Sequence, residues 1–312
     1  MQPANKGISI WIEWITGSYL FVGLAVWVTW IMSGDERGLR LFFDYAAASF
    51  FVGMACFELC LTVVCYRQFS VGEPLRRAWL LIAASSACRV TGMAVAHILG
   101  VKSYLNPFYW QKSLTLDDSV ASFFRPLGLV VSGPMHMALL AIGLFQVLKI
   151  YRGVGLAVRL RNIDRLLLAL VLGFTAWQGC EIALSKPFSG SFSAYTLINW
   201  MTDPLLCVLL WQAILIQRYV SSMGKGFVPR CWGAFTKAIF ATSLGSMGMW
   251  ASAYQHIPYP LNSISWYIWF LVSALFTLGP AYQLEAIQRA NLHVQLKPFE
   301  TETKHKLRFI ES

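Results

Sequence analysis

The chain has 312 residues, of which 57% are hydrophobic and 13% are charged, and its formal net charge is +10. Soluble domains carry about 25% charged residues, so this composition excludes an ordinary soluble protein and indicates one that lies in lipid. The cations do not form a basic patch interleaved with aromatic residues. We therefore expect the lipid bilayer as the partner and no nucleic acid.

Eight stretches are long and apolar enough to cross a bilayer, which requires roughly 20 helical residues. They are residues 9–32, 42–66, 77–100, 127–150, 164–185, 195–218, 235–255 and 262–285. Backbone groups in lipid must form hydrogen bonds within their own segment, so each stretch is expected to be a helix. The predicted fold class is an all-α, polytopic integral membrane helix bundle of about eight transmembrane helices. We expect residues 1–285 to form the bundle and residues 286–312 to form a cytoplasmic C-terminal tail.

Lys and Arg are distributed unevenly among the connections between these stretches. With the N-terminus inside, the inner segments carry about three times as many as the outer loops, which predicts a multi-pass protein of the inner (cytoplasmic) membrane with both ends in the cytoplasm. We expect the last helix to extend as far as Gln295 and to be interrupted at Pro298, because proline lacks the backbone N–H. The basic inner loops and the tail are the expected contact surface for a protein partner.

The second to seventh stretches can be read as three similar hairpins, which would form a pseudo-repeat. Arg77-Ala-Trp79 and Arg230-Cys-Trp232 mark corresponding inner helix starts in two of them. Topology alone imposes part of this likeness, so the sequence leaves open whether a true repeat is present.

Seven ionisable side chains of the apolar stretches are candidate functional groups, because insertion of a charged group into lipid costs about 2.5–3.5 kcal/mol. Glu58 and Arg89 lie at similar depth on consecutive antiparallel helices, so we predict an intramembrane ion pair that either fixes helix register or takes part in transport. The other five lie nearer the outside, and we predict that they form a ligand- or ion-binding site. These five residues are Asp44, His97, His136, Glu181 and Asp203. The alternative is that each is satisfied separately by its own neighbours.

No hydrolase, metalloprotease, phosphate-loop or dinucleotide-binding motif is present in the sequence, so an enzymatic function is not the favoured interpretation. The favoured function is binding or transport of a small solute or ion through the outer-half site. The alternatives are a sensor or assembly subunit that acts through a partner protein, and a redox or pigment-binding subunit. In the last case His97 and His136 would be haem ligands, or the five outer residues would bind a metal ion.

Overall fold

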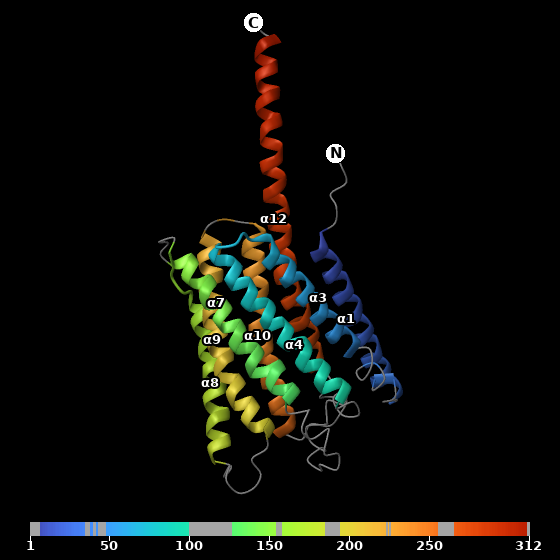
Figure 1. Ribbon diagram of the computed structural model, residues 1–312. Coiled ribbons are helices and arrows are strands. Elements are labelled where there is room, and N and C mark those ends of the chain that lie inside the picture. The colour runs from blue at the N-terminus through green and yellow to red at the C-terminus, as the bar shows by residue number, and fades with distance from the viewer. Residues whose placement is uncertain are drawn as a thin grey trace.

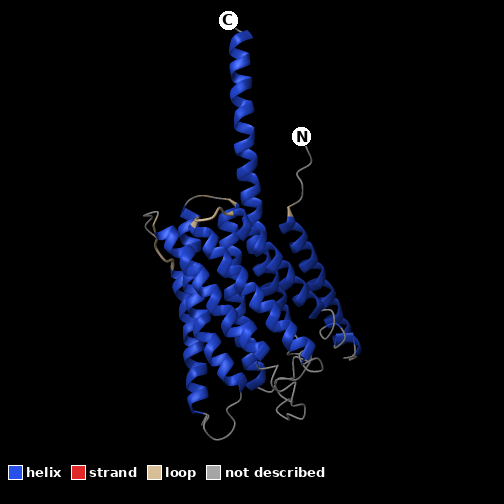
Figure 2. Ribbon diagram, viewed as in Figure 1, coloured by secondary structure: helices blue, strands red, loops and turns tan. Residues whose placement is uncertain are grey.

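The computed structural model describes residues 7–34, 38–39, 42, 48–99, 127–153, 158–184, 194–222, 224, 226–254 and 265–310. Every regular element within these ranges is helical (Figure 2), which confirms the predicted all-α class. The long helices are α1 (Ile8–Ser33), α3 (Ala48–Gln68), α4 (Pro74–Leu99), α7 (His136–Arg152), α8 (Asn162–Leu184), α9 (Ala194–Ser222), α10 (Phe227–Tyr254) and α12 (Ser265–Ile310), and a short π-helix, η2 (Val131–Met135), leads into α7.

Seven of the helices are long and apolar enough to cross a membrane: α1, α3, α4, the continuous η2–α7 segment, α8, α9 and α12. The eight long helices, α10 included, alternate in direction through the bundle, and α1 begins at the end of the bundle from which α12 leaves (Figure 1). The chain is therefore a multi-pass membrane protein. The same end carries the described basic connections, and it is called the inner end below, after the orientation that the charge pattern predicts.

Six helices form a closed ring of neighbours, in the order α3, α4, α7, α9, α10 and α12, with α12 returning to α3. The other two lie outside this ring: α1 packs against α12, and α8 packs against α9. Helices α3 and α4 form a packed hairpin, as do α9 and α10, whereas the main neighbours of α7 are α4 and α9. In the expected middle hairpin, α7 packs on α4 and α9, and α8 packs on α9. The two helices are thus not each other's main neighbours, and the pseudo-repeat stays a prediction.

Helix α10 is packed mainly against α9 and α12. It buries polar as well as apolar side chains, among them Thr242 and Ser243, whose hydroxyls donate to carbonyl oxygens of their own helix. A helix surrounded by other helices needs less apolar surface than one facing lipid. This packing is compatible with the buried polar groups of α10, and its membrane crossing stays a prediction.

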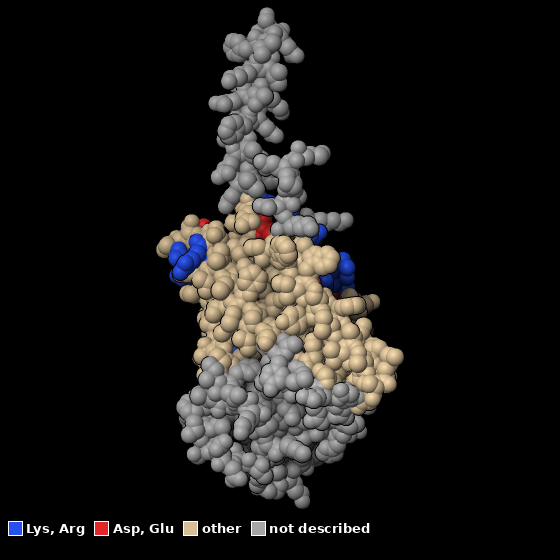
Figure 3. Space-filling model, turned by 90° about the vertical axis from the view of Figure 1, so that its right-hand side faces the viewer, with Lys and Arg blue, Asp and Glu red and all other residues tan. Residues whose placement is uncertain are grey.

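The outer helices α1 and α8 present large apolar side chains to their surroundings. Trp14 is 67% exposed and Phe21 is 73% exposed on α1, and Leu172 is 61% exposed on α8. A soluble protein would bury such residues, whereas lipid accepts them. Figure 3 shows a broad uncharged band around the middle of the described surface, with Lys, Arg, Asp and Glu gathered near the end from which α12 leaves.

Helix α12 has 46 residues and continues past Pro298 to Ile310, so the expected interruption at Pro298 is wrong. A proline removes one hydrogen bond and crowds the carbonyl four residues earlier, but the bonds on either side can carry the helix through. Figure 1 shows this helix projecting well beyond the bundle. Its last 20 residues would span about 30 Å at 1.5 Å per residue.

Contacts at the inner end attach α1 to α12. The Ser9 backbone N–H donates to Glu285 Oε1 at 3.0 Å, which satisfies one of the free amides at the start of α1. The Tyr282 hydroxyl donates to Glu13 Oε1 at 2.8 Å. The first and last long helices of the described chain are thus joined by polar contacts at their shared end.

Candidate intramembrane polar site

One face of α4 carries three polar side chains inside the helix ring. Ser85 and Ser86 precede Arg89 by four and three residues, so the three share one face of the helix. Ser85 and Ser86 are each 1% exposed, and Arg89 is 8% exposed. Their burial means that they must be satisfied by neighbouring helices, because neither lipid nor a dry core offers hydrogen bonds.

Glu58 on α3 provides the counter-charge for this face. Arg89 Nη2 lies 2.5 Å from Glu58 Oε2, and the Ser86 hydroxyl donates to Glu58 Oε1 at 2.8 Å. Glu58 is only 2% exposed. The ion-pair contact predicted from depth is therefore present, and its role in coupling helices stays a prediction.

His136 connects the same face of α4 to α7. Its Nδ1 lies 2.7 Å from Ser85 Oγ and 3.0 Å from the Ser85 carbonyl oxygen, and the Ser85 hydroxyl donates to the His136 carbonyl oxygen at 2.9 Å. A backbone carbonyl can only accept, so this arrangement assigns the proton to Nδ1. The imidazole then presents Nε2 as a free acceptor.

Phe276 on α12 contacts both Arg89 and His136. The Arg89 guanidinium carbon is 5.3 Å from the centroid of its ring, and the His136 ring is 6.1 Å away in an edge-on arrangement. Phe276 also contacts Phe235 of α10, with centroids 6.1 Å apart. The polar site therefore touches α3, α4, α7 and α12.

Aromatic side chains fill the ring next to this site. Trp79 and Trp232 have ring centroids 6.0 Å apart, Trp232 and Phe235 are 5.6 Å apart, and both tryptophans are at most 2% exposed. The Trp232 indole donates to the Tyr151 hydroxyl at 3.3 Å. Because Trp79 and Trp232 lie near the inner starts of α4 and α10, this aromatic cluster separates the polar site from the inner end of the bundle.

A close approach of two helices fixes the position of His136. A Cβ added to Gly92 of α4 would lie 2.5 Å from both the Gly128 carbonyl oxygen and the Ser132 amide nitrogen. Pro134 lies in the π-helix at this point, two residues before His136. Such π-turns are frequent at functional sites, and here the turn and Gly92 let the start of α7 lie against α4.

Three buried nitrogen atoms of the site have no hydrogen-bond partner among the described residues. Arg89 Nη2 still has its ion-pair contact with Glu58 Oε2, which leaves two nitrogen atoms without any polar contact. They are Arg89 Nε, which is a donor, and His136 Nε2, which is an acceptor in the tautomer assigned above. Buried polar atoms without a partner are rare in native proteins and indicate a bound water, ion or ligand. Each of these two atoms can therefore take a further polar partner, an acceptor at Arg89 Nε and a donor at His136 Nε2.

The predicted outer residues are only partly described. His136 belongs to the site above, whereas Asp203 on α9 accepts a hydrogen bond from Gln178 on α8. Thr175 and Cys207 form a second contact between α8 and α9, at 3.3 Å. Asp44 and the side chains of His97 and Glu181 lie outside the described residues. The five-residue outer site therefore stays a prediction.

Metal and haem binding also stay predictions. Among the side chains that the structure describes, no three His, Cys, Asp or Glu residues lie together as a group that could hold a metal ion. The proposed haem pair requires the side chain of His97, which is not among them.

Ser85, Ser86 and Phe276 are site residues that the sequence did not predict, because none of them is ionisable. The serines could have been identified because their spacing places them on the face of Arg89. Phe276 carried no such signal, since a phenylalanine in an apolar helix is ordinary core composition.

No protein-family model, no curated protein and no solved structure matches the chain significantly. The geometry of the chain itself is thus the basis for any statement about its function.

Proposed function

We propose that this multi-pass membrane protein binds a small polar solute or ion inside its helix bundle and transports it across the inner membrane. One observation carries the proposal: Glu58, Arg89 and His136 come from three helices, are almost fully buried, and leave Arg89 Nε and His136 Nε2 unpartnered. Ionisable groups at membrane depth are costly and usually functional. The basic inner end supports the assignment to the cytoplasmic membrane.

The chemistry of the two free nitrogens limits the ligand. The ligand needs an acceptor or a negative charge for Arg89 and a donor for His136. A small hydroxylated or carboxylic acid, or a hydrated anion, meets both requirements. Asp44, His97, Glu181 and Asp203 would extend the route towards the outer face.

The experiment is a thermal-shift screen of purified protein against small organic acids, amino acids, sugars and inorganic ions. The test variant is His136→Phe, which keeps the aromatic contact with Phe276 and removes both ring nitrogens. The matched control is Thr242→Val, because Thr242 is also buried but donates only to Ala238 of its own helix. We expect a solute that raises the melting temperature of the wild type and the control but not of His136→Phe. Equal responses in all three proteins would contradict the proposal.

A sensor that acts through a partner is the second candidate, and α12 favours it. This helix contacts the polar site through Phe276 and continues without a break to Ile310, outside the bundle. A change at Arg89 or His136 would act directly on a helix that reaches a partner. Uptake of the identified solute into proteoliposomes would support transport, whereas binding without uptake, together with a partner that is retained only by the full-length chain, would support sensing.

A further inference from the structure

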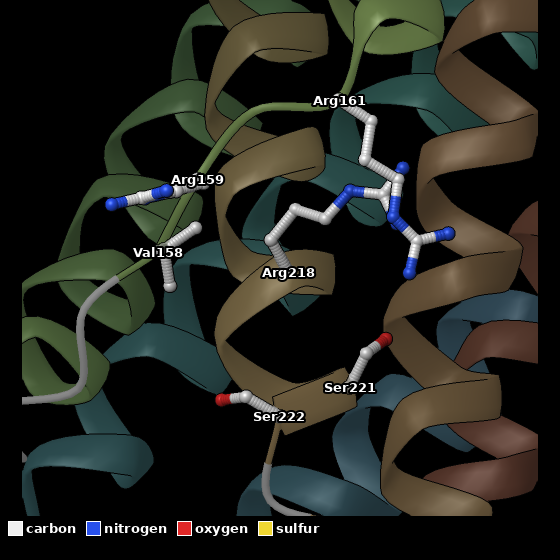
Figure 4. A pocket seen from close by; sticks show the side chains of 6 residues that line it. All are labelled: Val158, Arg159, Arg161, Arg218, Ser221 and Ser222. Atoms are coloured by element: carbon white, nitrogen blue, oxygen red, sulfur yellow. The ribbon is translucent and has the colours of Figure 1, made fainter.

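A hollow of about 210 Å³ opens where the connection between α7 and α8 meets the end of α9. Its lining residues are Val158, Arg159, Arg161, Arg218, Ser221 and Ser222. Figure 4 shows the side chains of Arg161 and Arg218 lying side by side, whereas Arg159 points away from them. Two guanidinium groups thus lie together at the hollow, and Arg159 lines another part of it.

Asp164 holds Arg161 and Arg218 in place but balances only part of the positive charge at the hollow. Arg218 donates to the Asp164 carboxylate from Nε, at 2.8 Å, and from Nη2, at 2.5 Å, and the Arg161 backbone N–H donates to Asp164 Oδ2 at 2.8 Å. The Asp164 side chain is 4% exposed, whereas that of Arg218 is 19% exposed. The carboxylate therefore lies beneath the arginines, and an excess of positive charge faces outward.

The hollow offers hydrogen-bond donors that its own contacts do not use. The bidentate pair occupies Nε and Nη2 of Arg218 and leaves Nη1 to donate elsewhere. Ser221 Oγ accepts from Gln217 Nε2 at 3.1 Å, so its own proton is available. Guanidinium groups with a hydroxyl donor match the oxygens of a phosphate group.

The depth of the hollow points to lipid as the source of that phosphate. Asp164 lies in the first turn of one apolar span, Asn162–Cys180, and Arg218 lies near the end of another, Met201–Ser222. Both positions correspond to headgroup level. Beside them, Ile163 is 52% exposed and Leu166 is 54% exposed on α8, which gives acyl chains an apolar surface to contact.

We propose that this hollow binds the phosphate group of an anionic phospholipid headgroup, with Arg161 and Arg218 as the principal donors and Arg159 adding attraction. The site is independent of the intramembrane polar site. Asp164 acts as a positioning residue, because it binds the Arg218 guanidinium and the Arg161 backbone N–H and does not contact the phosphate.

The test compares the full-length protein with Arg161→Gln and Arg159→Gln, and uses Arg67→Gln as the matched control. Arg67 is an exposed arginine in the last turn of α3, at the same end of the bundle and outside the hollow. Retained phosphatidylglycerol is measured by native mass spectrometry from mixed micelles, with phosphatidylcholine as the zwitterionic comparison. Inorganic phosphate is added in a separate arm to distinguish a soluble phosphate from a lipid headgroup. Size-exclusion profiles verify that each variant is folded.

We expect Arg161→Gln to weaken phosphatidylglycerol binding about fivefold, and Arg159→Gln to weaken it less, while Arg67→Gln and phosphatidylcholine binding stay unchanged. Competition by millimolar inorganic phosphate would show that the same guanidinium groups accept a soluble phosphate and would assign the site to that source in place of lipid. Equal losses in Arg161→Gln and Arg67→Gln would overturn the proposal, because general surface charge would then explain binding. Wild-type affinity in both hollow variants would overturn it as well.

Discussion

Replacing Glu58 by Gln removes the negative charge that faces Arg89 but keeps the size of the side chain and its ability to accept from Ser86. Arg89 is 8% exposed, so its charge would remain buried without a counter-charge. Removing one partner of a buried ion pair costs about 3–5 kcal/mol, whereas replacing both partners is often close to neutral. We therefore expect Glu58→Gln and Arg89→Met each to destabilise the bundle by about 3–5 kcal/mol.

The double variant Glu58→Gln/Arg89→Met separates this explanation from simple loss of packing. The two single changes should sum to at least about 6 kcal/mol, and the double variant should lose no more than about 2 kcal/mol, so the coupling is about 4 kcal/mol or more. The assay is reversible unfolding by SDS titration in mixed micelles, followed by tryptophan fluorescence and far-UV circular dichroism. Thr242→Val serves as the control for a buried polar change elsewhere. Additive losses in the double variant would refute the reasoning.

Three further predictions use the same titration. Gly92→Leu should destabilise the bundle by about 2–3 kcal/mol, because its Cβ would lie 2.5 Å from the Gly128 carbonyl oxygen; wild-type stability would mean that the two helices can separate at no cost. Asp164→Asn should cost about 1–2 kcal/mol, since it weakens the two hydrogen bonds from a partly exposed Arg218, and a loss no larger than that of an exposed control would speak against a structural role for the pair. Truncation after residue 290 should change stability by less than about 0.5 kcal/mol, because it removes only helix outside the bundle; a larger loss would show that this segment packs on the bundle.

Much of the fold could be predicted because two properties depend on one segment at a time. They are the hydropathy of the segment and the need of its backbone groups to form hydrogen bonds within it in lipid. The expected stretch 127–150 corresponds to the observed span Leu127–Arg152, and the stretch 9–32 corresponds to Ile8–Ser33. The contact between Glu58 and Arg89 followed from equal depth on consecutive helices. Each of these features can be predicted from one segment, or from two helices that follow each other in the sequence.

The remaining features depend on contacts between helices that are distant in sequence. Nothing in the sequence states that Ser85 of α4 binds His136 of α7, because a serine in a helix can equally well donate to its own backbone. The pairing of Asp164 with Arg218 requires that α8 lie against α9, which the sequence of neither helix states. The continuation of α12 past Pro298 was missed because a single proline was treated as a helix end.

The hydrogen bond between the Ser9 amide and Glu285 has a consequence for biogenesis. Ser9 leaves the ribosome 276 residues ahead of its partner Glu285. The first span must therefore enter the bilayer with this amide unsatisfied by protein, and the helix ring closes only when the final span arrives to pack on α3. A nascent chain arrested before Glu285 would carry all of the earlier spans and still lack the hydrogen bond that joins α1 to α12.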